Sequence, residues 1–115
     1  MVALAVAAVF WTGCAHKPLM RPASIVFACA DANFYADHLH WTSWSSSGAT
    51  ATGTGHRNDC KPYCAAGHFH AFPIAVRLSH VVRCLKGRSE FARVAWTGPN
   101  PGSETLPCSF LKLKS

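Results

Sequence analysis

HAFPIAVRLSHVVRC, residues 70–84, carries the clearest β-strand pattern in this chain. Large apolar side chains recur at every second position, as expected where one face of a strand is buried. These residues are Phe72, Ile74, Val76 and Leu78. Pro73 lies near the start, and proline is tolerated at the first residue of a strand or on an edge strand. We therefore predict a β-strand here, with a second strand or a bulged continuation over 81–84.

Other short strand-like segments surround this one. Residues 24–30 form a continuous apolar run, and residues 90–96 alternate before a GPNPG stop at 98–102. No segment keeps the 3.6-residue period of a helix. The pattern predicts an all-β fold, namely a small disulfide-stapled antiparallel β-sandwich that is either immunoglobulin-like or barrel-like.

HLHWTSW, residues 38–44, alternates in the manner of a strand with two faces. Trp41 and Trp44 are three positions apart, however, so a regular strand would point them to opposite faces. A β-bulge near Ser43 would turn both indoles inward. The following ATATGTG, residues 49–55, places threonines on one face and small residues on the other, which leaves room for a tryptophan ring from the neighbouring strand. A phosphate-binding loop is the alternative, but no Lys-Ser/Thr follows the glycines.

The N-terminal segment is apolar and typical of export. Residues 1–11, MVALAVAAVFW, have no polar side chain and are too short to span a bilayer, which fits the core of a signal peptide. Thr12, Gly13 and Cys14 resemble the end of a bacterial lipobox, although Trp11 replaces the usual leucine and no basic residue precedes the run. We predict lipidation at Cys14; simple cleavage after Ala15, or a buried N-terminal strand or helix, are the alternatives.

These observations divide the chain into three parts. Residues 1–14 are a signal or lipobox-like export segment, residues 15–23 are a tether, and residues 24–115 form one β domain. One domain is what 115 residues allow. A lipid-anchored form would be held in the membrane, because a bacterial lipoprotein carries more than one acyl chain.

Six cysteines in so short an exported chain predict disulfides. With Cys14 acylated, five remain as candidates: Cys29, Cys60, Cys64, Cys84 and Cys108. We expect Cys29 to bridge to Cys60 or Cys64, and Cys84 to pair with Cys108. A direct bridge between Cys60 and Cys64 is the alternative, although it closes a very small loop.

Several motifs resemble a group of small exported proteins from high-GC Gram-positive bacteria. They are CADANFY from Cys29, the Trp41 and Trp44 pair, ATGTG at 51–55, and NDCKPYCAAGHFHAFP from Asn58. The resemblance covers about two thirds of the chain and implies export and the domain boundary, without implying a mechanism. Within the last motif, Asn58 and Asp59 favour a turn held by hydrogen bonds from side chain to backbone.

Two H-x-H pairs are the candidate metal ligands. They are His38 with His40 and His68 with His70. On a strand, residues i and i+2 point to one face, so each pair can present two imidazoles to Zn²⁺ or Cu²⁺, and two adjacent pairs would complete a four-nitrogen site. The Asp37 carboxylate would hydrogen-bond one of the metal-ligating histidines and so orient its ring. The alternative is that these histidines are half-exposed strand residues whose hydrogen bonds fix turns, with no cofactor.

The charge distribution and the search for catalytic motifs argue against two classes of function. The net charge is +6, but the basic residues are scattered, which argues against nucleic-acid binding and favours weak attraction to anionic envelope polymers. No G-x-S-x-G elbow or pair of carboxylates is present, and a disulfide would abolish a Cys64–His68 nucleophile–base pair. We therefore predict no enzyme.

Taken together, the sequence predicts an exported protein of the cell envelope or extracellular space. We expect it to be a non-catalytic binding or interaction module for an envelope ligand or protein. The alternative is an envelope metal-binding protein that uses the two H-x-H pairs.

Overall fold

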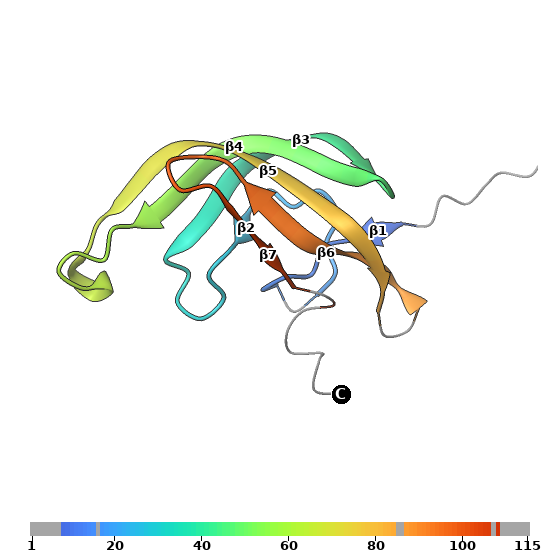
Figure 1. Ribbon diagram of the computed structural model, residues 1–115, viewed down its shortest axis with the longest axis horizontal. Helices are drawn as coiled ribbons and strands as arrows, with labels where there is room; N and C mark the ends of the chain where they lie inside the picture. The colour runs from blue at the N-terminus through green and yellow to red at the C-terminus, as the bar shows by residue number, and fades with distance from the viewer. Residues whose placement is uncertain (1–7, 16, 85–86, 107, 109–115) are drawn as a thin grey trace, which may run out of the picture.

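The computed structural model describes residues 8–15, 17–84, 87–106 and 108 and is built almost entirely of β-strands (Figure 1). The elements are β1 (Val9–Phe10), β2 (Ile25–Val26), β3 (Phe34–Ser45), β4 (Gly48–Asn58), the short 3₁₀ helix η1 (Cys64–Ala66), β5 (Phe69–Arg83), β6 (Ser89–Trp96) and β7 (Gly102–Thr105). The strands form one sheet in the order β1-β6-β5-β4-β3-β2, with β7 also paired to β6. The all-β prediction is confirmed. The sheet is curled and antiparallel except where β1 runs parallel to β6.

The long hairpin of β4 and β5 forms the centre of the sheet. The two strands pair without interruption from Ala49 opposite Leu78 to Asn58 opposite Phe69. The predicted inward face of β5 is confirmed, because Ile74, Val76 and Leu78 are buried and Phe72 packs against the core. Alternation along the strand therefore decides which face meets the core.

The predicted bulge in β3 is also confirmed. The register of β3 against β4 shifts between Trp41 and Ser43, so that Trp41 lies opposite Ala51 and Trp44 opposite Ala49. The two indole rings pack edge to face, 4.8 Å between centroids. Their N–H groups donate hydrogen bonds to backbone carbonyls of Pro22 and Val9, which satisfies the polar atom of each half-buried ring.

The N-terminal segment is part of this domain. Val9 and Phe10 pair with β6, Trp11 is 2% exposed, and the buried Thr12 hydroxyl donates a hydrogen bond to Glu90. The predicted division after Cys14 is therefore not a division of the fold, and the buried-strand alternative describes residues 9–14 better. Short apolar runs of β-branched and aromatic residues suit a buried strand as well as an export segment, so periodicity does not separate the two. Residues 1–7 lie outside the described residues.

Three disulfides connect the six cysteines, all of which are described, and none is free. The predicted Cys84–Cys108 bridge is confirmed. The predicted bridge from Cys29 to Cys60 or Cys64 is wrong, because Cys29 bonds to Cys14 while Cys60 and Cys64 bond to each other.

The Cys14–Cys29 bridge also contradicts lipidation of Cys14, because a sulfur in a disulfide cannot carry a thioether-linked lipid. The bridges that start at Cys14 and Cys84 close segments of 15 and 24 residues. In the chain-entropy model each contributes roughly 3 kcal/mol to stability.

Among the described residues, none forms a helix with the length and apolar character needed to cross a bilayer.

Candidate functional site

The two H-x-H pairs do not meet. His40 lies opposite Thr52, which in turn lies opposite Ala75 on β5, whereas His70 lies opposite Arg57. The two pairs are thus separated by five residues along the sheet, ~17 Å at ~3.3 Å per residue. The predicted four-imidazole metal site is therefore not assembled, and no group of three or more His, Cys, Asp or Glu side chains that could hold a metal occurs among the described residues.

A bulge explains why His38 and His40 do not act as a pair. The β3 register shifts between Asp37 and His40, and His38 adopts a left-handed backbone conformation with φ of 53°. The rule that residues i and i+2 share a face holds only in a regular strand. His38 instead turns back to Asp37, with 2.9 Å between Nδ1 and the carboxylate.

Several histidines have carboxylates as hydrogen-bond partners. Asp37 accepts hydrogen bonds from His38 and from His56 of β4, each at 2.9 Å. Asp59 accepts one from His70, also at 2.9 Å. His56 was not singled out by the sequence, since it is 19 residues from Asp37 and belongs to no motif. It also stacks on Tyr35, 4.6 Å between ring centroids.

The loop between β4 and β5, residues 59–68, is held by side-chain hydrogen bonds; we call it the tip loop. Asn58 accepts a hydrogen bond from the backbone N–H of Cys60 and donates one to the carbonyl of Cys64. Asp59 accepts from the backbone N–H groups of Lys61 and His68. The turn predicted at Asn58 and Asp59 is thus confirmed, and the Cys60–Cys64 disulfide closes the same loop.

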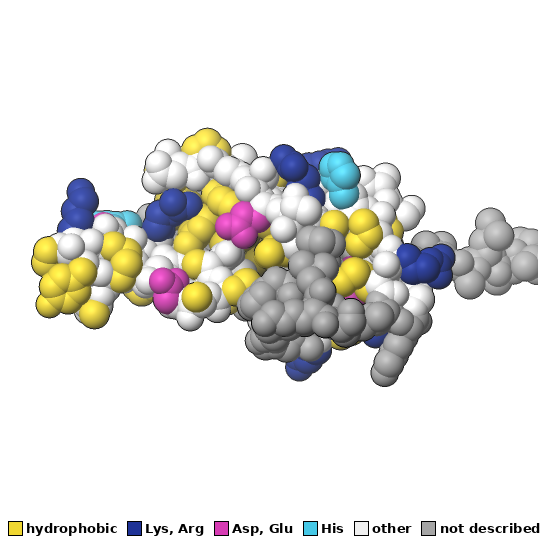
Figure 2. All heavy atoms as spheres, turned by 60° about the horizontal axis from the view of Figure 1, so that its bottom comes forward, with side chains coloured by type: hydrophobic (Ala, Val, Ile, Leu, Met, Phe, Trp, Pro, Cys, Tyr) yellow, Lys and Arg dark blue, Asp and Glu magenta, His cyan; other side chains and the backbone are white. Residues whose placement is uncertain are grey.

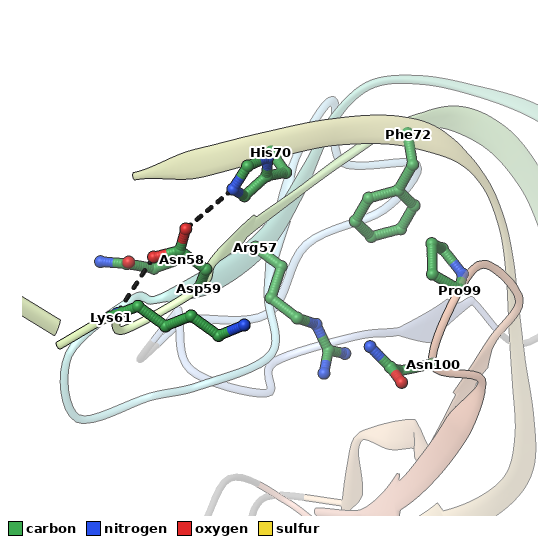
Figure 3. Close-up of a pocket in the computed structure, with 8 residues that line it drawn as sticks. All are labelled: Arg57, Asn58, Asp59, Lys61, His70, Phe72, Pro99 and Asn100. Carbon is green, nitrogen blue, oxygen red and sulfur yellow. Dashed lines mark hydrogen bonds and ion pairs between the residues drawn. The ribbon is translucent and has the colours of Figure 1, made fainter. Parts of the chain in front are cut away.

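A cavity of about 320 Å³ lies beside the base of the tip loop (Figure 3). Its lining comes from the β4–β5 hairpin and from the turn before β7; we call it the cationic pocket. It is lined by Arg57, Asn58, Asp59, Lys61, His70, Phe72, Pro99 and Asn100. Figure 3 shows the long side chains of Arg57 and Lys61 extending into the space between the hairpin and Asn100. Phe72 and Pro99 supply an apolar wall.

Arg57 is the most unusual residue of the pocket. Its guanidinium carbon lies 3.9 Å above the centre of the Phe34 ring, a cation–π contact that positions the charge. Its Nε atom is buried and has no hydrogen-bond partner among the described residues. None of the ion pairs between described residues involves Arg57 or Lys61. Both cations are therefore available to a ligand.

Asp59 is the acidic residue of the lining, and its charge is already engaged. The hydrogen bond from His70, followed by those from the backbone N–H groups of His68 and Lys61, lowers the pKa of Asp59 to about 2. The carboxylate is therefore ionised at neutral pH, with Oδ1 bonded to the tip loop and Oδ2 to His70 of β5. The arrangement leaves a net excess of positive charge facing the cavity.

No protein-family model, curated protein or solved structure matches this chain. The resemblance to exported proteins of high-GC Gram-positive bacteria stays a prediction. The chemistry of the cationic pocket therefore rests on its own side chains.

The sequence did not point to the pocket. Arg57, Lys61 and Asn100 belong to no ligand motif, and they meet only because the β6–β7 turn folds back beside the hairpin. The alternative nucleophile–base pair of Cys64 and His68 is excluded in this structure, since the Cys64 sulfur is bonded to Cys60. The absence of enzymatic activity stays a prediction.

The pKa of Asp59 gives a test of the tip loop. Because this pKa is about 2 in the folded protein against an ordinary 3.8, the ionised carboxylate stabilises the fold above pH 3.8. That contribution should disappear as the pH falls from about 4 to about 2. We expect Asp59→Asn to flatten the dependence of unfolding free energy on pH in this window, measured by urea denaturation.

Asp37 will leave a residual slope, because hydrogen bonds from His38 and His56 lower its pKa as well. Glu104→Gln, on the exposed strand β7, is the matched control and should keep the full slope. An Asp59→Asn curve parallel to that of the unmodified protein would contradict the proposed role of Asp59.

Proposed function

We propose that this protein is an exported, non-enzymatic binding module of the cell envelope, and that its cationic pocket binds an anionic group of the ligand. The observation that carries the proposal is Arg57, whose guanidinium extends into the cavity and forms no ion pair among the described residues (Figure 3). A guanidinium suits the two oxygens of a phosphate or carboxylate. An anionic ligand in the cavity would bind the terminal nitrogens of this group.

The other lining residues fit the same chemistry. Lys61 adds a second cation, Asn58 and Asn100 carry amide groups, and Phe72 and Pro99 form an apolar wall. Such a combination suits an anionic group carried on a sugar, glycerol or other partly apolar framework.

Support for export comes from the covalent framework. Three disulfides in a chain of 115 residues are typical of proteins that fold in an oxidising compartment. The net charge of +6 adds a long-range attraction toward anionic envelope components.

Binding can be measured with inorganic phosphate and glycerol phosphate as probes, followed by chemical-shift changes in ¹H–¹⁵N spectra. We expect both to shift signals of the tip loop and of Asn100. Arg57→Gln should weaken binding about 10- to 100-fold, because a charge-assisted hydrogen bond contributes about 1.5–3 kcal/mol.

Arg93→Gln is the matched control, since it removes one positive charge from an exposed position on β6, where Arg93 donates to Ser103. It should leave probe binding within about twofold of the unmodified protein, as only a screened surface charge is lost. Equal weakening by both substitutions would show diffuse charge attraction rather than a pocket, and the proposal would fail.

A further inference from the structure

The tip loop exposes an apolar apex beyond the cationic pocket. Tyr63 is 63% exposed and Phe69, directly after the loop, is 48% exposed. Pro62, Ala65 and Ala66 are exposed beside them. Figure 2 shows hydrophobic side chains gathered at this end of the molecule, with Lys or Arg side chains next to them. Exposed aromatic groups that cluster in one place are typical of contact surfaces.

The apex is held rigidly although it buries little. The loop that carries Tyr63 is fixed by the Cys60–Cys64 bridge, by the two hydrogen bonds between the Asn58 side chain and the loop backbone, and by the two backbone contacts of Asp59. A bridge that closes so few residues constrains the unfolded chain only weakly. Its main effect is to preorganise the loop, which lowers the entropic cost of binding through it.

Two cations lie just behind the apex. Lys61 is part of the tip loop, Arg57 is the second-last residue of β4 near the base of that loop, and both line the cationic pocket. The carboxylate of the neighbouring Asp59 is engaged by a hydrogen bond from His70. An apolar, aromatic tip with unpaired cations behind it matches the layers of an anionic bilayer, where phosphates lie above the acyl boundary.

We infer that the anionic group bound in the cationic pocket is the phosphate of a membrane lipid headgroup, and that the tip loop docks on the bilayer with Tyr63 and Pro62 inserted at the headgroup–acyl boundary. This inference rests on the proposed function and names the source of the anion. A bilayer fits better than a protein partner because the apex consists of five apolar side chains, two of them aromatic, whereas a specific protein interface needs about 20–30 residues on each side. Tyrosine also favours the membrane interface.

The test is co-sedimentation with vesicles of phosphatidylglycerol and phosphatidylcholine at a 3:7 ratio, against vesicles of phosphatidylcholine alone. The unmodified protein should sediment with the anionic vesicles, and less so as salt is raised. Tyr63→Ser should weaken this binding about tenfold and leave the phosphate titration unchanged, because Tyr63 does not line the pocket.

Val81→Ser is the matched control, since Val81 is an exposed apolar residue on β5 outside the tip loop and should have no effect on vesicle binding. If phosphate binds in solution but anionic vesicles retain no more protein than neutral ones, the inference is wrong and the proposed function stands. If phosphate does not bind at all, the proposed function fails and the inference fails with it. Unchanged vesicle binding of Tyr63→Ser would exclude docking through the apex.

Discussion

Replacing Trp11 with alanine should destabilise the domain by about 3–5 kcal/mol, the range found when a large aromatic side chain is removed from a packed core. Trp11 is 2% exposed, and its backbone pairs with Leu19 through two hydrogen bonds of 2.8 and 2.9 Å. Urea denaturation of oxidised protein measures the change directly. A loss of this size is a large part of the 5–15 kcal/mol that stabilises a typical domain.

The control for Trp11→Ala is Tyr63→Ala, which removes an exposed aromatic ring and should change stability by about 0.5 kcal/mol or less. The comparison decides the role of the N-terminal segment. A removable export segment contributes nothing to the stability of the remaining domain, so an effect of Trp11→Ala below about 1 kcal/mol would contradict the packing of residues 9–14.

The second large effect is expected at Glu90, a fully buried carboxylate on β6. It accepts a hydrogen bond of 2.6 Å from the Thr12 hydroxyl and forms an ion pair with Arg88, 3.1 Å from Nε to Oε2. Glu90→Ala should lower the free energy of unfolding by about 3–5 kcal/mol, because it leaves Arg88 and the Thr12 hydroxyl without the carboxylate that they contact. Chemical denaturation at neutral pH is the measurement.

Glu104→Ala on exposed β7 is the matched control for loss of a carboxylate and should be nearly neutral. A double-mutant cycle with Thr12→Val and Glu90→Ala isolates the contact between Thr12, which follows β1, and Glu90 of β6. Coupling of about 1–3 kcal/mol is expected for a buried hydrogen bond to a charged group. No measurable coupling would show that the two side chains do not interact in solution.

The features that the sequence predicted correctly are those with local causes. The inward face of β5 follows from a two-residue period, and the bulge follows from the parity of Trp41 and Trp44 opposite small residues. The turn at Asn58 and Asp59 depends on side chains within a few positions of the backbone groups that they bind.

The features that the sequence missed depend on which distant segments become neighbours. The H-x-H spacing could not reveal that β4 and β5 place His40 and His70 far apart. Cys29 has Cys14 as its partner because the N-terminal segment enters the sheet, and a short apolar run does not predict that. Arg57 and Asn100 meet through tertiary structure alone.

The parallel pairing of β1 with β6 also sets an order of events during synthesis. Thr12 and Glu90 are separated by 78 positions in the chain, so the first strand has no partner until most of the protein has been made. At ~5–20 residues per second this interval lasts roughly 4–16 s. During that time Val9 and Phe10 lack their strand partner, although Trp11 can already pair with Leu19 and Cys14 with Cys29. The strand that is made first therefore joins the sheet only when a partner near the end of the chain emerges.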